Sequence, residues 1–283
     1  MKVFERAEDL LHIHSDLGSQ QLAFIPTMGA LHQGHLSLVR AAQAKGHKTI
    51  VSIFVNPLQF NNSEDLLKYP RTLQADLKLL DDQGVDWVFT PNIDEMYPAS
   101  IADVEVDLGL LEDRFEGAFR PGHFHGVVQV VYRLFKYVNP SEVFFGQKDL
   151  QQCLVIEQLI EQVFPHIKMH RVQTMREDSG LAMSSRNVRL SPESLLKAAE
   201  ISKSLKDIAT RKEEFCEAID LHSQRLAAIG IEVEYLNCVS LPWMDALECD
   251  HFTKEPNPSN GHQNAVIFAG SLNGVRLIDN WVF

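Results

Sequence analysis

The sequence predicts an α/β protein with a Rossmann-like parallel sheet domain and a smaller C-terminal α+β domain. Through about residue 175, short β-rich runs alternate with amphipathic stretches, which is typical of βαβ units. The run Thr49–Val55 is almost continuously apolar or β-branched, which suits a central strand buried on both faces. Beyond these units, two helical patterns precede three strand patterns, so the chain changes character there.

The predicted elements of the first domain follow one another in order. Its strands are Leu22–Ile25, Lys48–Val55, Val85–Thr90, Glu142–Phe145 and Ile167–Val172. Its helices are Leu36–Lys45, Thr72–Gln83, Val127–Val138 and Leu150–Phe164. Apolar residues recur at helical spacing in the second set and in continuous runs in the first.

The second domain is predicted to begin with helices. Ser191 is a candidate N-cap and Pro192 suits the first helical position, so a helix runs through about Ala209. A second helix, roughly Lys212–Ala228, ends before Gly230. Strands Ile231–Val239, Ala265–Ala269 and Val275–Ile278 follow, and Lys254–Gln263 is a polar loop. We place the domains at 1–183 and 184–283, with a linker near 176–190.

Composition limits the classes of function. The 283 residues are 45% hydrophobic and carry a formal charge of −12, which argues against a nucleic-acid partner. The four cysteines form no C-x-x-C pair, so neither a zinc knuckle nor a disulfide framework is expected. The first residues are too polar for a signal peptide, and no window approaches ~20 uninterrupted apolar residues. We therefore expect a cytoplasmic protein without a membrane partner.

The segment Ile25–His35, Ile-Pro-Thr-Met-Gly-Ala-Leu-His-Gln-Gly-His, joins the first predicted strand to the first predicted helix. A turn leading into a helix N-terminus offers unpaired backbone N–H groups and a positive dipole end to an anion. His32 and His35 lie there, and imidazoles can hydrogen-bond a phosphate and stabilise charge that develops on it. This predicts nucleotide chemistry. A metal site is the alternative, because a spacing of three places both histidines on one helix face.

Two further segments supply positive charge. Gly146-Gln-Lys-Asp149 follows a predicted strand, where open α/β sheets bind ligands. Its glycine lets backbone approach a phosphate and Lys148 offers a mobile charge. In Ser184-Ser-Arg186, two hydroxyls beside a guanidinium can donate to a polyphosphate. Either segment could instead be an ordinary solvated loop.

Two glutamines are candidates for holding a small polar substrate. Gln59 follows the predicted central strand after Pro57, which ends the strand, so we expect it at the carboxyl edge of the sheet. Gln152 lies one turn into the helix that follows Lys148. A neutral amide can bind a hydroxyl or a carboxylate, although most glutamines are surface residues.

The segments together resemble the pantothenate synthetase (pantoate–β-alanine ligase) family of HxGH nucleotidyltransferases. The matching segments occur in order as Pro-Thr-Met-Gly-x-Leu-His-x-Gly-His35, Val51-Ser-Ile-Phe-Val-Asn-Pro-x-Gln-Phe60, Arg120-Pro-Gly-His-Phe124, Phe145-Gly-x-Lys-Asp-x-Gln-Gln152, Ser184-Ser-Arg-Asn187 and Arg276-Leu-Ile-Asp-Asn280. The resemblance spans nearly the whole chain. Gln33 and Gln147 stand where the family commonly has acidic residues, and the Lys254–Gln263 loop resembles an insertion.

The resemblance implies an ATP-dependent ligase. Pantoate attacks the α-phosphorus of ATP, releasing pyrophosphate, and β-alanine then attacks the pantoyl adenylate to give pantothenate and AMP. The implied catalytic residues are His35, His32, Lys148, Ser184, Ser185 and Arg186. Gln59 and Gln152 are implied to hold substrate. The implied ATP site comprises Met28, Gly29, Ala30, Leu31, His32, Gln33, Gly34, His35, Gly146, Gln147, Lys148, Asp149, Met175, Met183, Ser184, Ser185 and Arg186.

The resemblance also implies Mg²⁺ with the ATP, with Asp76 one possible ligand, and a homodimer. Three rival functions remain at this stage. A related ligase or adenylyltransferase would activate another small acid. A non-catalytic nucleotide sensor would use the histidines only as anion contacts, and a metal hydrolase would use His32 and His35 as ligands.

Overall fold

The computed structural model describes residues 1–61, 63–211, 215–247 and 263–283. The chain divides into two compact units. Unit 1 comprises Met1–Gly146 and Gln151–Gln173, and unit 2 comprises Gln147–Leu150 and Thr174–Phe283. The division falls before Thr174, whereas the sequence places a boundary after residue 183. The short segment after β5 also groups with unit 2.

Unit 1 contains the predicted parallel sheet. Its described strands are β1 (Lys2–Phe4), β2 (Leu22–Thr27), β3 (Lys48–Ile53), β4 (Trp87–Phe89), β5 (Glu142–Gly146) and β6 (Lys168–Val172). They form one sheet in the order β1-β4-β3-β2-β5-β6, and every neighbouring pair is parallel. The Rossmann-like prediction is confirmed. The sequence pattern missed β1, which has three residues and pairs at the sheet edge.

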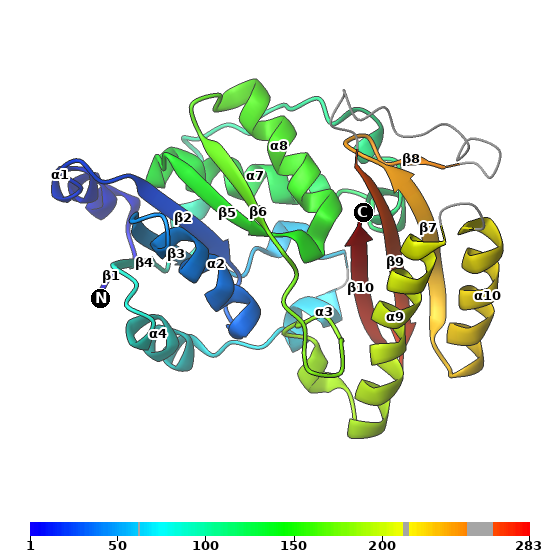
Figure 1. Ribbon diagram of the computed structural model, residues 1–283. Coiled ribbons are helices and arrows are strands. Elements are labelled where there is room, and N and C mark those ends of the chain that lie inside the picture. Colours follow the sequence, from blue (N-terminus) through cyan, green and yellow to red (C-terminus); the bar gives the residue numbers. More distant parts are fainter. Residues whose placement is uncertain (62, 212–214, 248–262) are drawn as a thin grey trace. The chain divides into compact units, whose positions relative to one another are not determined.

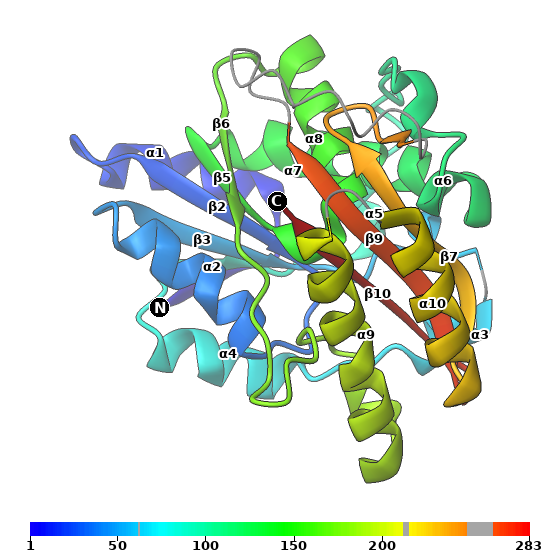
Figure 2. The ribbon, with the colours of Figure 1, turned by 45° about the vertical axis from the view of Figure 1, so that its right-hand side comes forward.

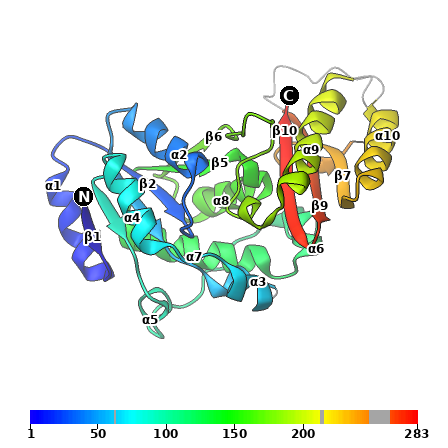
Figure 3. The same ribbon diagram turned by 90° about the horizontal axis from the view of Figure 1, so that it is seen from below.

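Helices cover both faces of this sheet (Figure 3). The described α-helices of unit 1 are α1 (Ile13–Asp16), α2 (Gln33–Gln43), α3 (Ser63–Lys68), α4 (Leu73–Asp82), α5 (Ile93–Met96), α6 (Glu116–Phe119), α7 (His123–Val138) and α8 (Leu150–Val163). The sequence predicted α2, α4, α7 and α8, with shifted ends. The other helices of the unit span six residues or fewer, too short for a helical period to show.

Alternate residues of β2 explain how the helices are held. Ala23 and Ile25 belong to an apolar cluster with α2 and α4. Phe24 points to the opposite face, where its ring meets Phe135 of α7 edge-on at 6.3 Å. Because successive strand side chains face opposite sides, a strand apolar at every position must be covered on both. The apolar pattern therefore accounts for the burial of this strand.

Unit 2 is an antiparallel sheet with helices on one face (Figures 1 and 2). Its described elements are α9 (Pro192–Thr210), α10 (Phe215–Ala228), β7 (Glu232–Ser240), β8 (Asp245–Ala246), β9 (Asn264–Leu272) and β10 (Val275–Val282). The strands lie in the order β10-β9-β7-β8. This confirms the predicted smaller α+β domain. Most of the predicted polar loop, 254–262, lies outside the described residues, as do 212–214 of the predicted second helix.

Polar contacts support the core of unit 2. Ser191 caps α9 by accepting from the Ser194 backbone N–H, as predicted. His222 of α10 links the two helices, with Nδ1 3.1 Å from Ser204 Oγ and Nε2 2.7 Å from Asp207 Oδ2. Cys216 is disulfide-bonded, which the spacing of the four cysteines did not indicate.

Among the described residues, no helix is long and apolar enough to cross a membrane.

Candidate functional site

The turn between β2 and α2 carries the two histidines predicted to be catalytic. His32 is the N-cap of α2, and its Nδ1 accepts a hydrogen bond from the Gly34 backbone N–H at 3.1 Å. His35 Nδ1 accepts in return from the His32 backbone N–H at 3.3 Å. This is a capping box built from two imidazoles, whose centroids lie 4.2 Å apart. The helix begins at Gln33, earlier than the predicted Leu36, because the cap lies in the motif itself.

These bonds fix the tautomer of both rings. A nitrogen that accepts a hydrogen bond carries no proton, so a neutral ring that accepts at Nδ1 holds its proton at Nε2. His32 and His35 therefore each present an Nε2–H donor. A pair of such donors suits the negative oxygens of a phosphate better than it suits a metal ion, which would bind the nitrogen lone pair.

Several backbone N–H groups of the turn are hydrogen-bonded within the protein, whereas the sequence predicted that they would be unpaired. Asp76 of α4 is 2% exposed, and its carboxylate accepts from Ala30 N at 3.0 Å and Leu31 N at 2.8 Å. The Thr72 hydroxyl donates to the same carboxylate at 3.1 Å. Gly29 N donates to Thr27 Oγ1 at 3.2 Å. The expected array of unpaired donors is thus wrong for these positions, because internal acceptors already bind them.

Backbone conformation explains why this turn needs a brace. Gly29 has φ +78° and Ala30 has φ +50°, so two successive residues are left-handed. That region costs an alanine roughly 1 kcal/mol or more, and the cost must be offset by local bonds. A Cβ on Gly29 would lie 3.0 Å from Asp76 Oδ2. The carboxylate therefore approaches the turn as closely as glycine permits.

Gln59 is held beside the same turn. It ends a short 3-10 helix, Pro57–Gln59, and is 8% exposed. Its Nε2 donates to Met28 Sδ at 2.6 Å, and its Oε1 accepts from Asn56 Nδ2 at 3.2 Å. The Tyr97 hydroxyl in turn donates to Asn56 Oδ1 at 2.6 Å. The structure thus brings together Met28 and Gln59, two predicted site residues, and fixes the direction of the Gln59 amide.

Two residues that the sequence reasoning gave no role also hold Gln59. His123 Nδ1 lies 2.8 Å from the Gln59 backbone oxygen, and Arg120 Nη2 donates to that oxygen at 3.2 Å. Arg120 Nη1 lies 3.1 Å from His123 Nε2. The signal was present in Arg120-Pro-Gly-His-Phe124, which contributed to the family resemblance without an assigned function.

Gln152, the other glutamine predicted to hold substrate, is a half-buried residue in the first turn of α8.

Lys148 belongs to unit 2. It lies in a 3-10 turn, Gln147–Asp149, between β5 and α8. Its side chain is 18% exposed, and its Nζ lies 3.9 Å from Asp149 Oδ1. Asn280 of β10 donates to the backbone oxygens of Gln147 and Lys148 at 2.8 and 2.9 Å.

Met175 and Met183 are neighbours in unit 2. Met183 N donates to Met175 O at 3.0 Å, and Arg176 and Ala182 form an antiparallel bridge, so 175–183 is a hairpin. The next residue, Ser184, accepts from the Arg186 backbone N–H at 3.2 Å and begins the turn into the 3-10 helix Asn187–Arg189. The predicted ATP-site residues are therefore divided, with both histidines in unit 1 and Lys148 and Ser184–Arg186 in unit 2.

Asp76, the predicted metal ligand, already accepts hydrogen bonds within the protein. Both oxygens of Asp76 accept hydrogen bonds from the turn, so this carboxylate does not fit a Mg²⁺ ligand. Within the described ranges, no group of three His, Cys, Asp or Glu side chains could hold a metal ion. We therefore treat Mg²⁺ as part of a Mg–ATP substrate and derive no step through it.

The sequence matches the family described as Pantoate-beta-alanine ligase over residues 2–282. This chain belongs to that family. Curated relatives agree: a pantothenate synthetase of Cytophaga hutchinsonii is 42% identical, covering 93% of this chain and 92% of its own length. A pantoate–beta-alanine ligase of Schizosaccharomyces pombe is 43% identical, covering 92% of this chain and 90% of its own length.

Solved structures give the same assignment. A pantothenate synthetase of Thermus thermophilus superposes with a TM-score of 0.87 at 38% identity over 99% of both chains. A pantoate-beta-alanine ligase of Francisella tularensis, in complex with a β,γ-ATP and β-alanine, gives a TM-score of 0.80 at 31% identity, covering 100% of this chain and 97% of its own. Membership of the ligase family excludes the metal hydrolase and the non-catalytic sensor as interpretations of the histidine motif.

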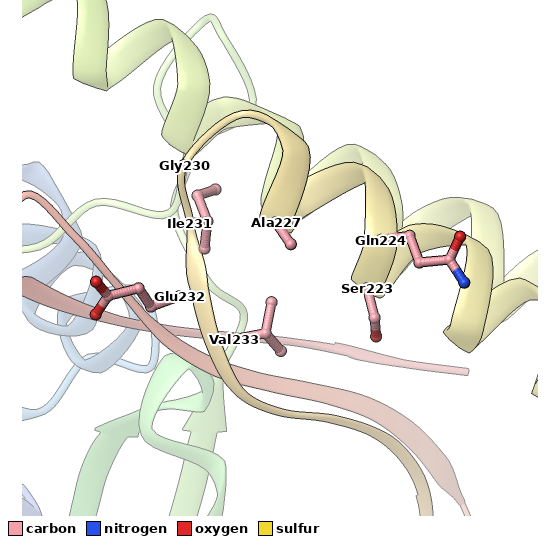
Figure 4. Close-up of a pocket in the computed structure, with 7 residues that line it drawn as sticks. All are labelled: Ser223, Gln224, Ala227, Gly230, Ile231, Glu232 and Val233. Atoms are coloured by element: carbon pink, nitrogen blue, oxygen red, sulfur yellow. The ribbon is translucent and has the colours of Figure 1, made fainter.

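A hollow of about 610 Å³ lies elsewhere in this ligase, between the end of α10 and the start of β7, from Ser223 to Val233 (Figure 4). None of the residues that line it belongs to the predicted site. Ala227, Ile231 and Val233 give it a partly apolar lining, without convergent charge. We assign it no part in the reaction.

Proposed function

We propose that this pantoate–β-alanine ligase works through a pantoyl adenylate. In the first step, a carboxylate oxygen of (R)-pantoate bonds to the α-phosphorus of ATP, and the bridging P–O bond breaks to release pyrophosphate. In the second, the β-alanine amine attacks the acyl carbon, the C–O bond to AMP breaks, and the amine loses a proton. The product is pantothenate. An in-line transfer of this kind depends on positioning and charge stabilisation more than on covalent participation by the protein.

The paired imidazoles are the observation that carries this proposal. Charge builds on the α-phosphate oxygens in the first step, and fixed donors stabilise such charge without reorganising. Because backbone N–H groups bind both Nδ1 atoms, the Nε2–H donors of His32 and His35 are set before substrate arrives. We infer that His35 is the main donor to the α-phosphate and that His32 assists it.

Lys148 and Ser184–Arg186 complete the proposed chemistry. We infer that the Lys148 ammonium stabilises the departing phosphates, while Ser184, Ser185 and Arg186 bind the triphosphate. Arg can bind two phosphate oxygens at once, and hydroxyls add single donors. The remaining ATP-site residues, from Met28 to His35, Gly146 to Asp149, Met175 and Met183, stay proposals that rest on the family resemblance.

The acid substrate is assigned to the glutamines. The Gln59 amide has two donor hydrogens and two acceptor lone pairs, of which the structure uses one each, for Met28 and Asn56. The second donor can therefore bind a pantoate or β-alanine oxygen without disturbing the orientation of the amide. We propose that Gln152 binds pantoate as well. The homodimer, the cytoplasmic location and the use of Mg²⁺ remain predictions.

The test is pyrophosphate exchange. Purified protein is given ATP, labelled pyrophosphate and either pantoate, lactate or another small hydroxy acid. We expect exchange with pantoate alone and without β-alanine. Exchange with another acid in preference to pantoate would assign the protein to a neighbouring ligase, and a strict requirement for β-alanine would contradict the adenylate route.

A further inference from the structure

The end of β10 carries an Asp-Asn pair that the proposed chemistry leaves without a role. Asn280 is 3% exposed, and both hydrogens of its amide are used, one for Gln147 O at 2.8 Å and one for Lys148 O at 2.9 Å. Its Oδ1 has no hydrogen-bond partner in the described part of the chain. A buried acceptor without a partner lowers the stability of the fold, so core packing alone does not account for an asparagine at this position.

Asp279 ties a second segment to the same strand. Its carboxylate receives Arg176 Nη1 at 2.7 Å and Nη2 at 3.0 Å, and Arg176 Nη2 also donates to Asn280 O at 3.1 Å. Asp279 Oδ1 accepts from the Asn280 backbone N–H at 2.8 Å, which locks the two neighbours together. Burial raises the pKa of Asp279, which Arg176 opposes by pairing with the ionised form.

The two segments held by this pair are both predicted to bind ATP. Arg176 lies in the 175–183 hairpin, next to Met175, and it also donates to Gly180 O at 3.1 Å. Asn280 holds the 3-10 turn that carries Lys148. Three-residue turns of this type have poor internal hydrogen bonds and depend on outside contacts.

We propose that Asp279 and Asn280 are positioning residues. They fix the Lys148 turn and the Met175–Met183 hairpin to the same strand, β10. The inference deepens the proposed function and rests on the role of Lys148 in it. Neither residue is given contact with substrate. Asn280 acts on Lys148 through the two backbone carbonyls, so its loss lets the turn shift and moves the ammonium away from the phosphates. A displacement of about 1 Å can cost roughly 10²-fold in rate.

The decisive experiment is a double-mutant cycle in the exchange assay, with Asn280→Ala, Lys148→Ala and the pair together. We expect Asn280→Ala alone to reduce kcat for pantoate-dependent exchange roughly 10-fold, with a smaller change in KM for ATP. In the Lys148→Ala background, the same substitution should change kcat by less than about 2-fold, because the group it positions is gone. A general structural defect would instead lower the rate equally in both backgrounds, and that result would overturn the proposal. Full activity of Asn280→Ala would overturn it too.

Two control variants match the substitutions elsewhere in unit 2. Glu234→Gln removes the negative charge from the bidentate pair between Glu234 and Arg276, as Asp279→Asn removes it from the pair with Arg176. Asn273→Gly removes a hydrogen bond that the Asn273 side-chain amide donates to Ser194 Oγ, at a residue with φ +51°, where glycine is tolerated. We expect both controls to keep wild-type exchange and Asp279→Asn to lose activity. Equal losses in Glu234→Gln and Asp279→Asn would contradict the special role of the pair.

Folding is monitored by thermal unfolding of each variant. If Asn280→Ala does not fold, Asn280→Ser keeps a polar side chain whose hydroxyl can donate to at most one of the two carbonyls, and a loss of kcat is expected; unchanged kcat would overturn the inference. The exchange activity of the wild type distinguishes a failure of the proposed function from a failure of the positioning role. Absence of pantoate-dependent exchange in the wild type rejects the proposed function, whereas normal exchange in wild type and Asn280→Ala alike rejects only the positioning role.

Discussion

The β2–α2 turn of unit 1 and the β5–α8 turn of unit 2 are each held by a buried side chain from a distant segment. In one turn that side chain accepts hydrogen bonds from the backbone, and in the other it donates them. Both follow a parallel strand, and both carry a residue predicted to act on phosphate. In the first, a buried carboxylate, Asp76, accepts from backbone N–H groups of the turn. In the second, a buried amide, Asn280, donates to backbone carbonyls.

The difference shows which kind of group each turn offers to its ligand. At the first turn the backbone donors are bound internally, so the turn offers side-chain donors, the imidazole Nε2–H groups, rather than backbone ones. At the second turn the backbone oxygens of Gln147 and Lys148 are bound internally, so the turn offers the side-chain ammonium of Lys148 rather than backbone acceptors. In each case a side chain that is distant in sequence binds the backbone of a turn that carries a residue predicted to act on phosphate.

The largest expected effect is at Lys148 itself. Lys148→Ala removes the charge that the braced turn presents, and we expect adenylation to fall on the order of 10²-fold or more. Pantoate-dependent pyrophosphate exchange measures this. Lys197→Ala, which removes a lysine paired with Glu193 on α9, is the matched control and should retain activity. Near-normal exchange by Lys148→Ala would refute its role.

Asp76→Asn tests the brace of the first turn. One amide oxygen can still accept, but the NH₂ group then faces a backbone N–H, so a buried donor loses its partner. We expect the free energy of unfolding to fall by about 1–3 kcal/mol and kcat to fall as well. Asp82→Asn on the same helix, where Asp82 pairs with Lys78 at the surface, should change neither quantity by much. Chemical denaturation with parallel kinetics distinguishes the outcomes.

Gly29→Ala and Gly46→Ala compare a crowded turn with an open one. The two glycines have φ +78° and +77°, so the backbone strain of alanine is nearly the same at each. A Cβ at Gly29 would lie 3.0 Å from Asp76 Oδ2 and 3.1 Å from Ile53 Cγ2, whereas a Cβ at Gly46 would have no atom within 4 Å. We expect Gly46→Ala to destabilise the fold by about 1 kcal/mol and Gly29→Ala to destabilise it by more. Equal melting temperatures would show that the Asp76 contact relaxes without cost.

The smallest effect is expected at the opposite, amino-terminal edge of the sheet, where Glu142 Oε2 lies 3.0 Å from His47 Nε2 and 2.7 Å from His170 Nε2. Burial alone would raise the pKa of Glu142, but these hydrogen bonds lower it below its usual 4.5. Its contribution to stability is therefore present above the unfolded pKa and is lost as pH falls through the folded pKa.

Glu142→Gln removes this contribution. Stability should then depend less on pH between about 5 and 3, while exchange activity at neutral pH is retained. Urea unfolding at several pH values measures the slope. A slope identical to that of the wild type would contradict the assignment.

Several features could be predicted from sequence because they depend on local pattern. The continuous apolar run in β3 and the capping signal Ser191-Pro192 are local, and both were confirmed. The short strand β1 was missed because three residues carry no period. The pairing of Met28 with Gln59 and the brace on Ala30 were missed because their partners are distant in sequence.

The sequence by itself determined the strand–helix alternation, the family and the kinds of side chain that we predict to carry the chemistry. Only the tertiary structure decided what holds those side chains. Asp76 lies 46 positions from Ala30, and Asn280 lies 132 positions from Lys148. Periodicity and capping follow from neighbours along the chain, but a hydrogen bond between distant segments exists only once the strands and helices that carry them have packed.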